Sequence, residues 1–297
     1  MMIQKTAMVT ISGRPNVGKS TLLNALVGEK IAIVTNKPQT TRNRILAVLN
    51  RAETQFVFID TPGYHSPRTR LGDYMVKVIR ESVSDVDAVI LMVEPIPNIG
   101  ANEARLIQWI SSGGVPAVLV INKIDTVKKE ELLAVIDLYR SAHDFSAIVP
   151  LSAKRGDGLD ELIGVLDQYA LEGPQLFPDD MITDQPERQI IAEILREKLL
   201  FCLEKEIPHG TAVEIEKFSE RDNEIIDVEA VIYTEKASHK GIIIGKKGAM
   251  LQKIGEMARL DMERFMGTRV YLQTWVKVKE KWRDSNYLLR NFGYGDQ

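Results

Sequence analysis

The first pattern that could do chemistry is the run Gly-X4-Gly-Lys-Ser, which is typical of phosphate-binding loops. It follows an apolar stretch and precedes an amphipathic one, as a loop between a strand and a helix would. Its backbone N–H groups could contact phosphates, Lys19 could neutralise the β and γ oxygens, and Ser20 could coordinate Mg²⁺. The candidate residues are Gly13, Arg14, Pro15, Asn16, Val17, Gly18, Lys19, Ser20 and Thr21. This loop predicts a nucleotide site but leaves the base open.

A second pattern, Asn-Lys-Ile-Asp, points to the base. It ends an apolar run, at the edge where parallel strands present their ligand-binding loops. The carboxylate of Asp125 can accept hydrogen bonds from N1–H and the 2-amino group of guanine, whereas adenine would face it with a lone pair. A Ser-Ala-Lys run after a later strand could brace the same ring. The candidate base-binding residues are Asn122, Lys123, Ile124, Asp125, Ser152, Ala153 and Lys154.

A third pattern predicts segments that respond to the γ-phosphate. It is the run Asp60, Thr61, Pro62, Gly63 and Tyr64. The aspartate could hold Mg²⁺ through water, and the Gly63 N–H could sense the γ-phosphate. Upstream, either Thr40 or Thr41 could close over the metal ion, and the sequence does not distinguish them. The expected catalytic residues are Lys19, Thr40, Thr41, Asp60 and Gly63, and the expected metal ligands are Ser20, Thr40, Thr41 and Asp60.

Two residues bear on the rate of hydrolysis. Tyr64 stands where Ras-type enzymes carry a water-orienting glutamine, so we expect slow intrinsic hydrolysis. Asn16 could bind a monovalent cation such as K⁺ near the phosphates, or it could only stabilise the loop.

These motifs need a scaffold, and residues 1–172 predict one. Strand patterns at 6–12, 88–93, 117–122 and 147–151 alternate with helical patterns at 19–26, 101–112, 129–140 and 158–171. This alternation predicts a doubly wound, mainly parallel α/β sheet. Residues 44–49 and 55–59 are too close for a helical crossover, so we expect them to form an antiparallel hairpin at the sheet edge. Residues 173–186 contain three Pro and one Gly and are predicted to form a linker.

Residues 187–297 predict a separate α+β module. A helix at 187–205 and strands at 211–218 and 225–233 precede a glycine-containing helical region and a last strand at 269–279. Within it, a Gly-X-X-Gly loop lies before a helix, as in KH modules that bind single-stranded RNA. Lys246 and Lys247 could contact phosphates, and the preceding isoleucines could wall a groove for bases. The candidate RNA-binding residues are Gly241, Ile242, Ile243, Ile244, Gly245, Lys246, Lys247 and Gly248.

Composition agrees with this division. The chain has 297 residues and a net charge of −3, but residues 236–297 contain 13 Lys or Arg against six Asp or Glu. The C-terminal part therefore carries +7 and the rest −10, which favours a polyanion as partner of the former. The chain lacks a signal-peptide core and any apolar run of about 18 residues or more, and it has one cysteine, so we expect a cytoplasmic protein.

The combined pattern is similar to the Era family of bacterial GTPases. The order of the five nucleotide motifs resembles translation-factor-type GTPases, and the module after them resembles a type II KH domain. This resemblance implies a P-loop GTPase domain at 1–172 followed by the KH domain at 187–297, with GTP, GDP and Mg²⁺ as ligands. It also implies a monomer that binds small-subunit (16S) ribosomal RNA near its 3′ end, acts in 30S subunit biogenesis and associates peripherally with the inner membrane.

Two other functions compete with this interpretation. One is a GTP-controlled protein or membrane adaptor whose KH-like module does not bind RNA and whose basic surface meets anionic headgroups. The other is a metabolic enzyme that uses GTP on a small substrate. The second has little support, because the sequence shows no further catalytic constellation outside the phosphate site.

Overall fold

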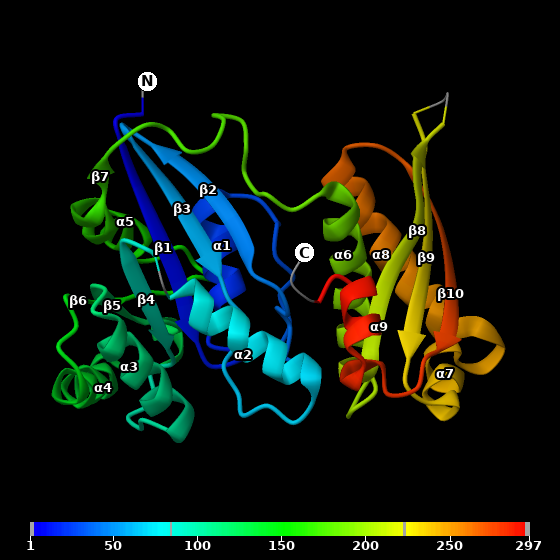
Figure 1. Cartoon of the computed structure of the whole chain (residues 1–297), viewed down its shortest axis with the longest axis horizontal. Helices are drawn as coiled ribbons and strands as arrows, with labels where there is room; N and C mark the ends of the chain where they lie inside the picture. The colour runs from blue at the N-terminus through cyan, green and yellow to red at the C-terminus, as the bar shows by residue number, and fades with distance from the viewer. Residues whose placement is uncertain (1–2, 84, 222–223, 295–297) are drawn as a thin grey trace. The chain divides into compact units, whose positions relative to one another are not determined.

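The computed structural model describes residues 3–83, 85–221 and 224–294, and it divides into two compact units (Figure 1). Unit 1 comprises residues 1–32, 41–67 and 72–184. Unit 2 comprises residues 33–40, 68–71 and 185–297. The segment 33–40 thus groups with the C-terminal part of the chain, although it lies far upstream in sequence.

Unit 1 is built on a twisted sheet whose strands, in spatial order, are β2-β3-β1-β4-β5-β6. Their bounds are β1 Lys5–Gly13, β2 Ile45–Arg51, β3 Thr54–Asp60, β4 Ala88–Val93, β5 Ala117–Ile121 and β6 Ala147–Pro150. β3, β1, β4, β5 and β6 run parallel, and β2 pairs antiparallel with β3. The predicted doubly wound sheet with its edge hairpin is therefore confirmed. The central strand β4 is buried throughout and β1 is buried from Val9 onward, as expected for parallel strands covered on both faces.

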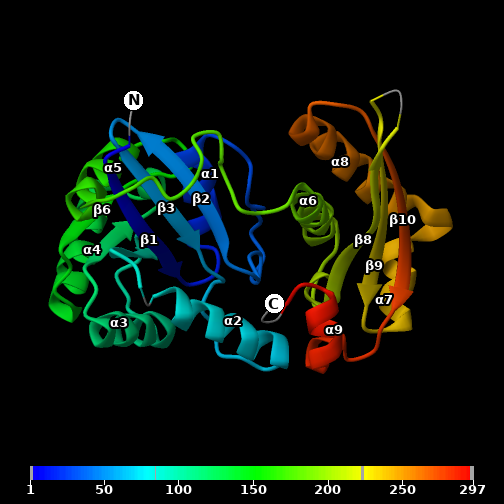
Figure 2. The ribbon, with the colours of Figure 1, turned by 45° about the horizontal axis from the view of Figure 1, so that its top comes forward.

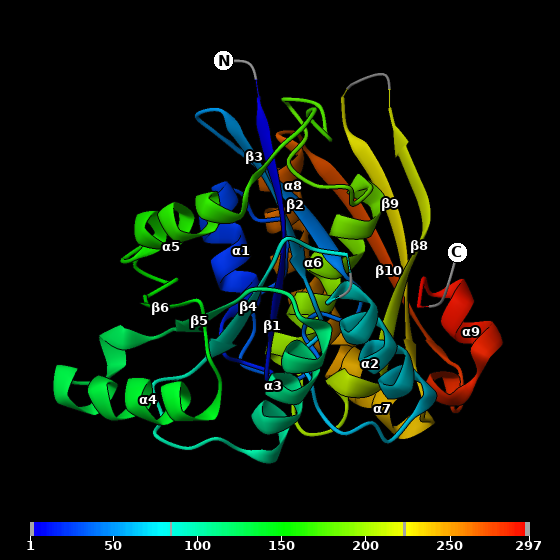
Figure 3. The same cartoon turned by 60° about the vertical axis from the view of Figure 1, so that its left-hand side comes forward.

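Helices cover both faces of this sheet (Figure 3). They are α1 Lys19–Val27, α2 Arg70–Ser82, α3 Ala101–Gly113, α4 Lys129–Ala142 and α5 Leu159–Leu166. Buried side chains of α1 and α5 pack on one face, and those of α2, α3 and α4 pack on the other. The helix expected at 158–171 is shorter, because a 3₁₀ turn at Asp167–Tyr169 follows α5. All the phosphate- and base-binding motifs follow strand ends at one edge of the sheet, which brings them together.

The last part of unit 1 lies along strands rather than free in solution. The short strand β7, Leu171–Glu172, pairs antiparallel with β1. Beyond it, Val48 N donates to Ile182 O at 2.8 Å, and Thr183 Oγ1 donates to Leu46 O. The segment up to Asp184, expected as a linker, thus lies along the outer edge of β2.

Unit 2 has a three-stranded sheet in the order β10-β9-β8, with α6 and α8 along one of its sides (Figure 2). The bounds are α6 Glu187–Cys202, β8 Thr211–Glu220, β9 Ile226–Thr234, α7 Ala237–Ile244, α8 Ala249–Met266, β10 Val270–Val278 and α9 Asn286–Asn291. β8 pairs antiparallel with β9, and β9 pairs parallel with β10. The order helix, two strands, two helices and a strand confirms the predicted type II KH topology. In the described part of the chain, no helix is both long and apolar enough to span a membrane.

Candidate functional site

The loop between β1 and α1 has the conformation that its glycines predict. Gly18 adopts φ +106°, in the left-handed region, and a Cβ there would lie 2.2 Å from Asn122 Nδ2. A Cβ at Gly63 would lie 2.7 Å from the backbone of Pro15. Only glycine therefore lets the loop approach both the base-binding motif and the segment after β3.

Lys19 is buried in this loop. Its Nζ donates to Gly13 O at 3.3 Å and to Arg14 O at 3.0 Å. Burial lowers the pKa of Lys19 from 10.5 to about 8, although the Asp60 carboxylate acts in the opposite direction. A buried ammonium held by neutral carbonyls is incompletely compensated, so an anion placed beside it would be strongly favoured.

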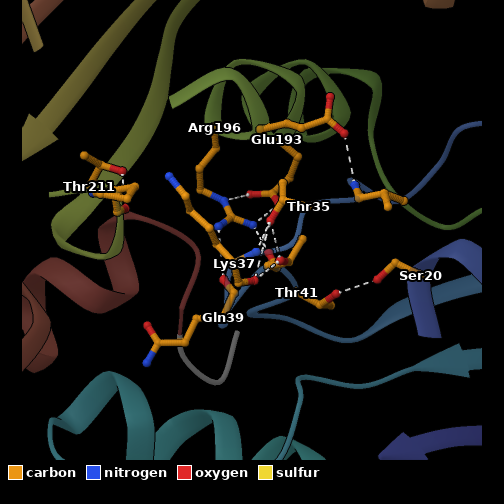
Figure 4. A network of polar contacts seen from close by, with 12 residues as sticks. Ser20, Thr35, Lys37, Gln39, Thr41, Glu193, Arg196 and Thr211 are labelled. Carbon is orange, nitrogen blue, oxygen red and sulfur yellow. Dashed lines mark hydrogen bonds and ion pairs between the residues drawn. The ribbon is translucent and has the colours of Figure 1, made fainter. Parts of the chain in front are cut away.

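A cluster of oxygens lies at the start of α1. Ser20 Oγ is 2.9 Å from both Thr41 Oγ1 and Asp60 Oδ2, and Thr41 Oγ1 donates to Asp60 Oδ2 at 3.2 Å (Figure 4 draws the first of these contacts). Asp60 is fully buried, burial raises its pKa, and its Oδ1 has no hydrogen-bond partner among the described residues.

These oxygens fit a magnesium ion. Ligands about 2.1 Å from Mg²⁺ on adjacent corners of an octahedron lie about 3.0 Å apart, close to the separation of the Ser20 and Thr41 hydroxyls. A buried carboxylate with an unused oxygen is also a group that a cation would stabilise. Thr40 lies differently, because its Oγ1 donates to Lys37 O at 2.7 Å and contacts Thr35 Oγ1. The geometry therefore favours Thr41 over Thr40 as the metal ligand.

The Asn122 side chain joins the Asn-Lys-Ile-Asp motif to the loop between β1 and α1 and to the Ser-Ala-Lys run. Asn122 is buried, its Nδ2 donates to Val17 O at 2.8 Å, and its Oδ1 accepts from Ala153 N at 2.9 Å. Ser152 Oγ donates to Asp125 Oδ1 at 2.7 Å, and this hydrogen bond lowers the pKa of the Asp125 carboxyl. The Asp125 carboxyl is thus held ionised, as a hydrogen-bond acceptor.

Two acidic residues that the motifs did not include support the loop from outside. Glu103, buried at the start of α3, pairs with Arg14 and accepts from Gly100 N at 3.0 Å. Glu94 accepts from Lys123 Nζ at 2.6 Å and pairs with Arg14 at 3.6 Å. The only sequence signal was Glu103 three residues after Gly100, the spacing of a helix-capping residue.

The two residues expected to affect the rate of hydrolysis, Tyr64 and Asn16, make different contacts. Tyr64 N donates to Gly13 O at 3.1 Å, and its ring packs edge-on against Trp109 of α3, with centroids 4.9 Å apart. Tyr64 is therefore a buried packing residue whose backbone contacts the phosphate loop. Asn16 has φ +67°, and its carbonyl oxygen accepts from Lys123 Nζ at 2.7 Å.

In unit 2, the Gly-X-X-Gly loop lies between α7 and α8. Gly245 and Gly248 have φ +72° and +84°, and a Cβ at Gly245 would meet Met250 at 2.7 Å. Lys246 and Lys247 are exposed. This arrangement presents two ammonium groups and a tight backbone, as phosphate contacts with a single strand require.

A hollow of about 330 Å³ lies beside this loop, between α8 and β10. Its lining residues are Gly248, Leu251, Gln252, Gly255, Glu256, Arg259, Leu272 and Thr274. The three isoleucines expected to wall a groove are not among them: Ile243 is buried in the core, and Ile242 is half exposed. The last glycine of the loop, the following helix α8 and the last strand β10 line the hollow instead.

Two parts of the chain match known protein families. Residues 8–123 match a family described as "50S ribosome-binding GTPase", and residues 206–283 match the KH domain. GTPase Era of Ruminiclostridium cellulolyticum is 50% identical over 293 residues, which cover 99% of this chain and 98% of that protein. GTPase Era of Clostridioides difficile is 52% identical over 295 residues, with 99% of each chain covered.

The chain belongs to the Era family of GTPases. Two solved Era structures superpose on this family member with a TM-score of 0.95 at 39% identity. One is a complex with MgGDPNP and nucleotides 1506–1542 of 16S ribosomal RNA, and it covers 99% of this chain and 100% of that chain. The other is an Aquifex aeolicus Era variant bound to GDP and AlF4⁻, with 98% and 100% covered. The predicted family, fold class and GTPase activity are confirmed.

Proposed function

We propose that this Era-family GTPase is a cytoplasmic switch whose nucleotide state controls the binding of its KH domain to small-subunit ribosomal RNA near the 3′ end, during 30S biogenesis. The observation that carries the proposal is the similarity, over the whole chain, to an Era that holds MgGDPNP and nucleotides 1506–1542 of 16S ribosomal RNA together. The exposed Lys246 and Lys247 beside the hollow between α8 and β10 support the RNA side.

The nucleotide roles proposed here follow from the geometry of unit 1. Ser20, Thr41 and Asp60 would hold Mg²⁺, which supplies positive charge to the β- and γ-phosphates when bound. Lys19 would exchange its carbonyl partners for phosphate oxygens, and the Gly63 N–H would face the γ-phosphate. The ionised Asp125 would accept from guanine. We propose slow intrinsic hydrolysis, because the buried Tyr64 has no side-chain amide to orient water.

The test of the RNA role is the affinity of the full chain for an RNA that spans nucleotides 1506–1542, measured by fluorescence anisotropy with GDP and with GDPNP. We expect Lys246→Asp with Lys247→Asp to weaken binding at least tenfold and to reduce the salt slope by about 1.4, because each single-strand phosphate contact contributes about 0.7. Equal RNA affinity with GDP and GDPNP would leave two independent units.

The matched control exchanges two adjacent exposed lysines of unit 1. Lys128→Asp with Lys129→Asp makes the same change in charge at the start of α4, where acidic residues are tolerated. We expect this variant to keep its RNA affinity within about twofold after correction for salt. If this control loses as much RNA affinity as the Lys246→Asp, Lys247→Asp variant, RNA binding depends on net charge alone and not on the Gly-X-X-Gly loop.

We further propose that K⁺ binds near Asn16 and accelerates hydrolysis. The left-handed backbone of Asn16 in the phosphate loop supports this placement. GTP turnover in K⁺ should then exceed turnover in Na⁺ at equal ionic strength, and equal turnover would remove the ion from the proposal.

Peripheral contact with the inner membrane is the remaining part of the proposal. The +7 charge of residues 236–297 supports attraction to anionic headgroups. Cosedimentation with vesicles that contain anionic lipid should exceed that with neutral vesicles and should fall with salt. Equal sedimentation with both would contradict it.

A further inference from the structure

The segment 33–40 is held within unit 2 by α6 and the residue that follows it (Figure 4). Arg196 donates from Nη1 to Gln39 O at 3.3 Å and from Nη2 to Thr40 O. Glu197 Oε1 accepts from Val34 N at 3.0 Å, and Lys37 Nζ donates to Leu203 O. Contacts at both ends and in the middle of the segment therefore fix its backbone.

Arg196 has the most demanding position among these contacts. Its side chain is 1% exposed, and Glu193 accepts from its Nε at 2.8 Å. Burial of a guanidinium is costly unless its donors are used, and here the remaining donors reach two consecutive main-chain carbonyls. Gln39 adopts φ +61°, a conformation that a non-glycine residue rarely takes without support. Arg196 thus stabilises a turn that the segment would not favour alone.

This turn lies directly before Thr41, which belongs to the nucleotide site. Thr40 O, which Arg196 contacts, belongs to the peptide group that joins Thr40 to Thr41. Thr41 is the residue whose hydroxyl lies 2.9 Å from Ser20 Oγ and 3.2 Å from Asp60 Oδ2. One guanidinium therefore fixes the peptide plane immediately before the proposed metal ligand.

We infer that Arg196 is a positioning residue that orients Thr41 for Mg²⁺ and the γ-phosphate, so that a residue of unit 2 tunes the preference for GTP over GDP. This inference rests on the proposed role of Thr41. GDP has no γ-phosphate for the segment to close over, so its affinity depends little on the turn. Arg196 does not touch the nucleotide. It acts through the peptide group between Thr40 and Thr41, whose carbonyl oxygen accepts from its guanidinium.

The experiment measures the affinity of the full chain for Mg²⁺-GDPNP and for Mg²⁺-GDP, without RNA, in Arg196→Met and Arg196→Lys variants. We expect Arg196→Met to weaken GDPNP at least fivefold while GDP changes less than twofold. Arg196→Lys keeps the charge but lacks the planar pair of donors, so it should fall between. In a Thr41→Ala background, Arg196→Met should add no further selective loss.

Arg188→Met is the matched control on the same helix. Arg188 Nη2 also donates to main-chain carbonyls, but to Ile215 and Glu216 of β8 rather than to the segment 33–40. Its GDPNP-to-GDP ratio should stay at the wild-type value, and circular dichroism should show that each variant is folded. Equal changes for both nucleotides, no change, or an undiminished effect in the Thr41→Ala background would overturn the inference.

The Arg196 inference and the proposed switch function can fail independently of each other. If RNA affinity does not depend on the nucleotide, the switch proposal fails, but the ratio of affinities measured without RNA still tests Arg196. If Arg196→Met leaves that ratio unchanged while RNA affinity does respond to GDPNP, the switch stands and this residue does not carry it.

Discussion

Lys19 offers a prediction whose size follows from the structure. Burial lowers its pKa to about 8, so the difference from 10.5 corresponds to about 3 kcal/mol that disfavours the buried ammonium before a ligand arrives. A bound phosphate would raise this pKa again, because it favours the charged form. The charged fraction in the free protein falls from about 0.9 at pH 7 to about 0.25 at pH 8.5, so GDP affinity should fall about fourfold.

Titration calorimetry checks this directly. At pH 8.5, binding of Mg²⁺-GDP should take up about three quarters of a proton, seen as a difference between buffers of unequal ionisation enthalpy. At pH 6.5 the uptake by Lys19 should vanish, because the free protein already holds that proton. Lys19→Ala should bind weakly and show neither the uptake nor the slope. A flat affinity from pH 7 to 8.5 in the wild type, or a slope that survives in Lys19→Ala, would refute the argument.

Three further substitutions test the rest of the nucleotide site. Asp125→Asn should weaken GTP at least a hundredfold and favour xanthosine triphosphate, whose 2-oxo group accepts from an amide; an unchanged ratio in competition binding would contradict the assigned base contact. Asn122→Ala should lower the free energy of unfolding by about 2 kcal/mol, because Val17 O and Ala153 N lose buried partners; urea titration measures it, and a change below about 0.5 kcal/mol would count against the bridge. Gly18→Ala should abolish nucleotide binding in calorimetry, because its Cβ would lie 2.2 Å from Asn122 Nδ2; near-normal affinity would show that the loop relaxes.

Much of unit 1 was predictable because its motifs sit at strand ends and its strands are continuous apolar runs. The five residues between 49 and 55 required a hairpin, and β2 and β3 form one. The patterns above include no helix at 70–82, where α2 lies, although the spacing of Leu71, Met75, Val78 and Ile79 is helical. The two-residue β7 and six-residue α9 are too short to show a period, although Ser285 does cap α9.

The sequence patterns do not predict contacts between residues that are far apart in the chain. Thr40 and Thr41 are adjacent residues of the same type, so only the hydrogen bonds of their hydroxyl groups show which one is suited to bind the metal ion. Arg196 lies in a stretch that reads as an ordinary amphipathic helix, and nothing in its spacing indicates carbonyl partners more than 150 residues upstream. The hollow beside the KH loop likewise depends on how α8 packs on β10.

The segment that lies along β2 has a practical consequence for dissecting the molecule. The edge of an outer strand carries unpaired amide and carbonyl groups that recruit other chains. Here, Ile182 and Thr183 occupy part of that edge from within the same polypeptide. A fragment that ends at residue 172 would expose the outer edge of β2 and should self-associate. A fragment that extends to Asp184 would keep this edge partly covered.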